Sequence, residues 1–270
     1  EAGRGGEPMP RGTMCAAFMY TSFPECLRLG VDKRFMQEAF LEREPPRGGT
    51  FTKTTPPSGM LQVRQCIPGT AAAAALQPGD VLLKLNGQPC ADFVLLDSVL
   101  DACVGKGVQL LLCRGDKFVD VELTVQDLHA LIPHSFIELA LGIFHEVPYQ
   151  TAQKHHIPMR GVYVAQAGFV FGETVKSDAV ILEINGKACN DLHAFEEALC
   201  SIPNKEYFNV TWMVPKSAKE RRKCEGSMKM QHHWCTFRAW ALDHATRAWS
   251  PRGLPAAAAA GGAAAQDVAA

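Results

Sequence analysis

Two segments of this chain follow the same sequence pattern, and this repeat limits what the chain can fold into. The segment "GDVLLKLNGQPCADFVLLDSVL" begins at Gly79, and "DAVILEINGKACNDLHAFEEAL" begins at Asp178. With Asn86 aligned on Asn185, the two copies match without a gap. Identical positions include Asn86/Asn185, Gly87/Gly186, Cys90/Cys189, Asp92/Asp191 and Leu100/Leu199. Because the repeated unit is the size of a small domain, we predict two tandem copies of one module.

Length, composition and charge exclude several classes of protein. A chain of 270 residues predicts about two domains, and an apolar content of 47% is enough to give each a core. The formal net charge of −1 gives no polyelectrolyte signature, so we expect no nucleic acid partner. No apolar run is long enough for a membrane-spanning helix, and the N-terminus has no secretory signal. The chain has no initiator Met, and we expect it to be part of a longer polypeptide.

The cysteines and histidines do not predict a disulfide framework or a metal site. The ten cysteines lie mostly among apolar neighbours and form no CxxC pair, which is typical of a reduced intracellular protein, nuclear or cytoplasmic. The basic stretch 216–223 is either a solvated linker or a nuclear localisation signal. The spacing of four potential ligands matches no common zinc pattern, so we predict no metal and no cofactor. These four are Cys224, His232, His233 and Cys235.

The expected elements are short strands with one or two helices in each copy. Strands are predicted at 60–67 and 161–167, and apolar residues at helical spacing predict helices over 93–103 and 192–200. We therefore predict an α+β fold class, mainly β, in which each copy is a small partly open β-barrel or sandwich capped by helices. The predicted division is a disordered N-terminus (1–10), domain 1 (11–128, with a Pro-rich loop at 42–58), domain 2 (129–238), an extension (239–254) and a disordered Ala/Gly-rich tail (255–270).

The order of these elements resembles a known domain. A strand, a small-residue helix, "PGDVLLKLNGQPC" and an amphipathic helix are similar to a PDZ domain of the permuted type found in HtrA/Deg serine proteases. "ALGIFHE" (140–146) resembles that family's carboxylate-binding loop, and the segment 10–31 occupies the same point of the first copy. With "VQDLHALIPHSFIELA" and "DHATRAW" (243–249), the pattern resembles the long, nuclear HtrA-like proteases of fungi and plants. The resemblance covers roughly residues 10–250 and implies two tandem PDZ-like domains.

Catalysis is not expected from this chain, although the resemblance implies a parent serine endopeptidase. A chymotrypsin-like domain needs His, Asp and Ser in that order, with a Gly-Asn-Ser-Gly-Gly-like segment at the nucleophile, and no such segment occurs. His193, Asp191 and Ser201 lie close in sequence without that context. We predict no catalytic residue and a role in substrate recognition or protease regulation. The alternative is a structural docking or oligomerisation module that binds no free peptide.

The predicted site is a peptide groove in each copy. A PDZ-like module adds an extended peptide to a sheet edge, and a terminal carboxylate sits among backbone N–H groups. The helices at 93–103 and 192–200 are expected to flank the two grooves. In domain 2 the resemblance places the carboxylate loop at Leu141, Gly142, Ile143 and Phe144. The other interpretation is that Leu141 and Ile143 belong to the core and Gly142 only turns the chain.

The first copy departs from the family pattern. Its matching residues are Thr13, Met14, Cys15 and Ala16, with Cys15 where glycine is expected. The sequence leaves three roles open for this copy: binding internal segments, docking against a neighbouring domain, or a purely structural role. The expected partners are peptides or unfolded segments, C-terminal ones among them, other domains of the parent protease, and a second copy in a homo-oligomer. No membrane partner is expected.

Overall fold

The structure is a computed structural model that describes residues 9–41, 58–172, 174–215, 222–231 and 237–253. The chain divides into two compact units, unit 1 (1–131) and unit 2 (132–270). The predicted class, α+β and mainly β with two modules, is confirmed, and the sheets are open. The predicted disordered tail and most of the Pro-rich loop lie outside the described residues. In the described part of the chain, no helix is long and apolar enough to cross a membrane.

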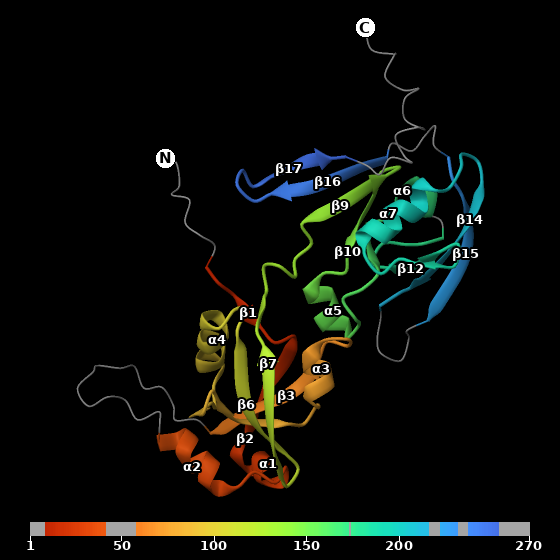
Figure 1. The fold of residues 1–270 in the computed structure, drawn as a ribbon. Coiled ribbons are helices and arrows are strands. Elements are labelled where there is room, and N and C mark those ends of the chain that lie inside the picture. The colour runs from red at the N-terminus through yellow and green to blue at the C-terminus, as the bar shows by residue number, and fades with distance from the viewer. Residues whose placement is uncertain (1–8, 42–57, 173, 216–221, 232–236, 254–270) are drawn as a thin grey trace. The chain divides into compact units, whose positions relative to one another are not determined.

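Unit 1 is built on a six-stranded sheet with the order β2-β3-β4-β6-β7, in which β5 pairs with β4 (Figure 1). A separate pair of short strands, β1 and β8, runs antiparallel. The described elements are β1 (Gly12–Thr13), β2 (Ala16–Ser22), α1 (Phe23–Arg28), α2 (Lys33–Leu41), β3 (Gly59–Cys66), α3 (Ala71–Ala75), β4 (Val81–Leu85), β5 (Gln88–Pro89), α4 (Phe93–Ala102), β6 (Gly107–Arg114), β7 (Lys117–Thr124) and β8 (Gln126–Asp127).

Unit 2 is built on a nine-stranded sheet with the order β15-β14-β12-β11-β10-β9-β16-β17, in which β13 pairs with β12 (Figure 1). The predicted extension therefore contributes strands to the sheet of this unit. The described elements are β9 (Ser135–Leu139), β10 (Gly142–Glu146), α5 (Tyr149–His155), β11 (Val162–Gln166), α6 (Gly168–Phe171), β12 (Val180–Ile184), β13 (Lys187–Ala188), α7 (Leu192–Cys200), β14 (Tyr207–Met213), β15 (Lys223–Lys229), β16 (Phe237–Asp243) and β17 (Ala248–Arg252).

The Asn-Gly pair of the repeat forms the same turn in both units. Asn86 and Asn185 have φ values of 50° and 49°, and the glycines after them also have positive φ. Asn and Gly tolerate this left-handed region best, and two such residues in succession make the tight turn that suits a hairpin. The Asn86 side chain accepts a hydrogen bond from the N–H of Gln109 at 2.9 Å, and Asn185 accepts one from Asn209 at 2.8 Å. Each turn is thereby attached to the next long strand, β6 or β14.

The other identical residues of the repeat also serve folding. Asp92 and Asp191 precede α4 and α7, and each carboxylate accepts a hydrogen bond of 2.8 Å from the backbone N–H three residues later. This is the N-cap arrangement that stabilises the start of a helix. Cys90 and Cys189 are completely buried in the two cores. The repeat thus preserves turns, caps and core positions, which explains why it predicted the fold so directly.

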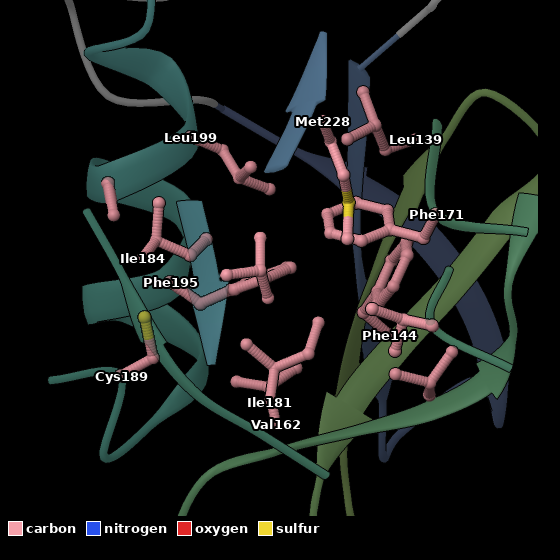
Figure 2. Close-up of a cluster of buried hydrophobic side chains, with 14 of the residues drawn as sticks. Leu139, Phe144, Val162, Phe171, Ile181, Ile184, Cys189, Phe195, Leu199 and Met228 are labelled. Atoms are coloured by element: carbon pink, nitrogen blue, oxygen red, sulfur yellow. The ribbon is translucent and has the colours of Figure 1, made fainter. Parts of the chain in front are cut away.

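Each unit has its own hydrophobic core. In unit 1 the main cluster lies between the sheet and α4, and a second, smaller cluster involves α1 and α2. In unit 2 a single cluster includes four buried phenylalanine rings, and the contacts among three of them join β10, α6 and α7. Figure 2 shows Leu139 of β9 in the same cluster as Phe171, Phe195 and Met228. The core of unit 2 therefore includes β9 as well as the repeated module.

We expect Asn86→Ala and Asn185→Ala each to destabilise its own unit by about 1–2 kcal/mol. Alanine loses the side-chain hydrogen bond and tolerates the left-handed region poorly. All four tryptophans of the chain lie in unit 2, so urea unfolding followed by tryptophan fluorescence reports that unit, and circular dichroism reports both. Asn209→Ala is the control, because Asn209 contributes only its backbone to the turn. Losses no larger than those of the control would contradict this role of the turn.

Candidate functional site

The predicted carboxylate loop of unit 2 lies in a tight hairpin. β9 and β10 are joined by Ala140 and Leu141, whose φ values are 51° and 63°. Leu139 pairs with Gly142 across this turn, so Gly142 begins β10. Leu141 is 59% exposed, and Ile143 beside it lines a shallow hollow on the outer face of the sheet. The predicted residues therefore lie partly in a turn and partly in a paired strand.

Both edges of β10 are already paired within the described chain. On one side it pairs with β11, and on the other side it pairs antiparallel with β9. The helix α7 contacts both β9 and β10, as expected of a helix that flanks the predicted groove (Figure 1). The position at which an added peptide strand would lie beside β10 is thus filled by β9.

The corresponding strand of unit 1 has an unpaired edge. β2 stands at one end of its sheet and pairs, among the described residues, only with β3. The helix α4, which is the repeat equivalent of α7, presents Phe93 at 42% exposure and an exposed Asp97. Their counterparts in α7, Leu192 and Glu196, are 3% and 0% exposed. Where β9, β16 and β17 are present, in unit 2, these two helix positions are buried. In unit 1 the same two positions are accessible.

Irregularities in the two strands establish which residues correspond. The pairing of β2 shifts between Ala17 and Phe18, and the pairing of β10 shifts between Ile143 and Phe144. Such bulges are fixed features of a strand and can be used as register marks. With these marks superposed, Phe18 corresponds to Phe144.

This register corrects the sequence alignment of the two loops by one residue. Ala16, not Cys15, occupies the position of Gly142, and Cys15 occupies the position of Leu141. The backbone supports this, because Cys15 and Leu141 both have left-handed φ values, 59° and 63°. The departure that the sequence indicated at Cys15 therefore does not fall on the glycine position, which carries the small side chain of Ala16.

The loop of unit 1 already uses some of its polar groups. The backbone N–H of Cys15 donates to the Thr13 hydroxyl at 3.1 Å, and its thiol donates to the Gln126 side chain at 3.2 Å. Burial, with a smaller contribution from Cys66, raises the pKa of the Cys15 thiol to about 11. Met14 is buried with them. The N–H of Cys15 is thus engaged within the loop, which favours a ligand without a terminal carboxylate there.

The residue types of a serine protease triad have local structural roles in unit 2. Asp191 caps α7, and the Ser201 hydroxyl donates to the Ala198 carbonyl at 2.7 Å. His193 lies 3.3 Å from Glu197 on the exposed side of the same helix. In the described ranges, no group of three potential ligands could hold a metal ion. Three of the four candidate metal ligands named from the sequence lie outside these ranges.

A second hollow in unit 2, of about 680 Å³, does not coincide with the predicted groove. Its lining comes mainly from α5, β11, β14 and the segments beside them, with Tyr163 and Asp178 among the residues. The Tyr163 hydroxyl donates to Asp178 at 2.5 Å, and burial is the main cause that raises the pKa of Tyr163 to about 12. This hollow is therefore separate from β10 and α7.

Comparisons with known proteins agree with this geometry. A family model described as "PDZ-like domain" matches residues 130–205. The pro-apoptotic serine protease nma111 of Aspergillus terreus is 37% identical over 203 residues, which are 75% of this chain and 18% of that protein. The protein of the same name from Aspergillus clavatus is 34% identical over 230 residues, 85% of this chain and 21% of its own length. Residues 130–205 thus match a PDZ-like domain, and most of the chain is similar to one region of these serine proteases.

The relationship applies to one region of those proteins. The chain spans about a fifth of the length of the curated relatives it matches. A solved structure, "HtrA-type protease AlgW with decapeptide", resembles it with a TM-score of 0.31 and 17% identity over 44% of this chain and 30% of that chain. The predicted resemblance to the PDZ region of HtrA-type proteases is confirmed.

The sequence reasoning missed several strands and one buried charge, and β2 and β10, which follow the predicted carboxylate loops, are among these strands. β9, β16 and β17 were not predicted, although "SFIEL" alternates between inward residues, Ile137 and Leu139, and outward residues, Phe136 and Glu138. That alternation is a signal of a strand with one buried face. Glu196 was not singled out, because its partner Arg252 is distant in sequence.

Buried thiols should make the stability of this chain fall as the pH rises into the alkaline range. Burial raises the pKa values of Cys15, Cys66 and Cys189 from 9.0 to about 11. The folded state then keeps protons that the unfolded state releases, so this stabilisation is present below pH 9 and is lost as the pH rises to 11. We expect the urea midpoint to fall across this interval. A Cys189→Ala variant should show a smaller fall for unit 2, and an unchanged midpoint would contradict the assignment.

Proposed function

We propose that this chain is a non-catalytic recognition region of an HtrA-type serine endopeptidase, and that unit 1 binds an extended peptide segment along β2. The observation that supports this best is the edge of β2, which no described strand pairs, in a module whose second copy has the same edge covered. PDZ domains add a peptide as a strand to such an edge. In this proposal the parent protein cleaves, and this region holds the substrate or regulates the protease, in the nucleus or cytoplasm.

The groups around β2 favour a particular kind of segment. Ala16 and Phe18 lie at the border of the core, partly buried, and Phe93 of α4 is exposed. Alternate apolar side chains of an added strand could cover these surfaces, because successive side chains of a strand point to opposite faces. The exposed carboxylate of Asp97 favours a basic side chain in the ligand. Since the N–H of Cys15 is engaged, internal segments are favoured over free C-termini.

A structural role is the second candidate, and one observation favours it for unit 2. Both edges of β10 are paired, so the carboxylate loop proposed at 141–144 has no vacant strand position beside it. In this reading unit 2 supports docking to other domains of the protease or a second copy of the chain. The two candidates differ in their prediction for free peptides, which only the first expects to bind.

We expect the full chain to bind end-blocked peptides that alternate apolar and other residues and carry one Lys or Arg. Phe93→Glu should weaken this binding by about tenfold or more, because it puts a charge on an apolar contact surface. The measurement is fluorescence anisotropy with a labelled peptide library. Asp97→Lys should shift preference from basic to acidic peptides.

The matched control for Phe93→Glu is Val94→Glu. Val94 is the next residue of α4 and is 76% exposed, so the same charge is added beside the groove surface rather than on it. Equal affinities for the two variants, both folded by circular dichroism, would show that β2 and α4 are not the binding site. Absence of binding by the unmodified chain would favour the structural role.

A further inference from the structure

β9 lies along β10 as an added peptide strand would. It runs antiparallel to β10, and its C-terminal end lies at the start of β10. Phe144 pairs with Ile137, and Gly142 pairs with Leu139. Both β9 residues are buried in the core that also contains Phe195 of α7. Figure 2 labels Leu139 and Phe195 in this cluster. Alternate aliphatic side chains of β9 therefore fill the space between β10 and the helix.

The end of β9 is fixed at the point where a free peptide would end. The chain continues through Ala140, whose carbonyl accepts a hydrogen bond of 2.9 Å from the N–H of Phe169 in α6. A side chain on Gly168, which has a φ of 66°, would come within 2.6 Å of the same carbonyl oxygen. α6 thus holds the turn after β9 in place by a close backbone contact that only glycine permits.

Two further strands cover the outer edge of β9 and connect it to α7. β16 pairs with β9, and β17 pairs with β16, so that Ile137, Ala239 and Arg252 lie in one row across the three strands. The Arg252 guanidinium donates twice to the carboxylate of Glu196 in α7, with one N–O distance of 3.4 Å and a second, shorter contact. This bidentate pair is the direct polar connection, among the described residues, between β17 and the helix over the groove.

The Glu196–Arg252 pair differs from a surface ion pair. Glu196 is completely buried, and its repeat counterpart Asp97 is exposed in unit 1, whose described residues include no such strands. A buried carboxylate is strongly destabilising without its partner, whereas a paired one is tolerated. α7 and β17 are therefore held together for as long as Arg252 remains in place, and loss of the pair favours separation of the added strands.

The local sequences explain why a strand covers the edge of β10 in unit 2, whereas no described strand covers β2 in unit 1. Residues 135–139, "SFIEL", alternate apolar and polar side chains and suit a strand. The equivalent stretch before β2 is "MPRGT" (9–13), where Pro10 cannot donate a ladder hydrogen bond and Gly12 adds no side chain to a core. In unit 1 this stretch pairs with β8 instead of β2.

We propose that β9 acts as a built-in ligand of unit 2 and occupies its peptide groove. The Glu196–Arg252 ion pair, which we call the latch, holds it there. When β9, β16 and β17 separate from α7, the groove becomes open to external extended segments with aliphatic residues at alternate positions, as in "SFIEL". This closed site in unit 2 is independent of the binding proposed for β2 in unit 1.

The test uses Arg252→Ala in the full chain and measures amide hydrogen exchange by mass spectrometry. Exchange in β9, β16 and β17 should be about tenfold faster than in the unmodified chain, with β14 and β15 unchanged, because local opening leaves the rest of the unit folded. The control is Arg238→Ala, which removes an equal charge from an exposed position of β16. If β9 exchanges no faster in Arg252→Ala than in the unmodified chain, the latch is disproved.

A binding measurement separates this proposal from the one for unit 1. The probe is a labelled synthetic peptide, SFIEL with a free carboxylate, and all chains carry Phe93→Glu so that unit 1 is blocked. Binding to the Arg252→Ala chain should be at least about tenfold tighter than to the chain with Arg252 intact. Equal binding to both, or none to the opened chain, would overturn the assignment of β9 as a built-in ligand.

Folding of the variant is controlled by a second substitution. In Glu196→Gln/Arg252→Ala the latch is absent and no buried charge is left without a partner, so the unit should stay folded by circular dichroism. This double variant should also exchange faster in β9 and bind SFIEL. If it behaves as the unmodified chain in both measurements, the pair does not control access to the groove.

Discussion

The backbone N–H and C=O groups of an edge strand need partners, and this constraint governs both units. In unit 2 the strand beside α7 obtains them from β9, so the sheet continues through β16 to β17. In unit 1 the equivalent strand, β2, remains at the end of its sheet. The same edge of the module is therefore covered in one copy and, among the described residues, uncovered in the other. The difference arises from the flanking segments rather than from the repeated sequence.

The repeated residues and the flanking residues have separate tasks. Asn86 and Asn185 make the turns, and Asp92 and Asp191 cap the helices, so both copies reach the same fold. What distinguishes the units is charge and burial on the flanking helix, where an exposed Asp97 corresponds to a buried Glu196. The resemblance to HtrA-type proteases accounts for the fold of the module. Whether the groove is accessible differs between the two copies.

Much of the module could be predicted from sequence because its signals are local. Periodicity, the Asn-Gly turn and the resemblance were sufficient for the fold class and for two tandem modules. The register at Cys15 was wrong by one residue, because a bulge changes the count along a strand and leaves no mark in a single sequence. β16 was missed since its pairing with β9 joins segments about a hundred residues apart, and β17 pairs in turn with β16. The partner of Glu196 is also distant, 56 residues along the chain.

The extension also changes which strand ends the sheet of unit 2. Without it, the sheet would end at β9, whose outer edge would then be open to pairing with other chains. The sheet instead ends at β17, a five-residue strand in which Pro251 lacks an N–H donor and Arg252 carries a charge. Short length, proline and charge are features with which proteins protect sheet edges against aggregation. The strands β16 and β17, which cover β9, thus also reduce the tendency of this sheet to pair with other chains.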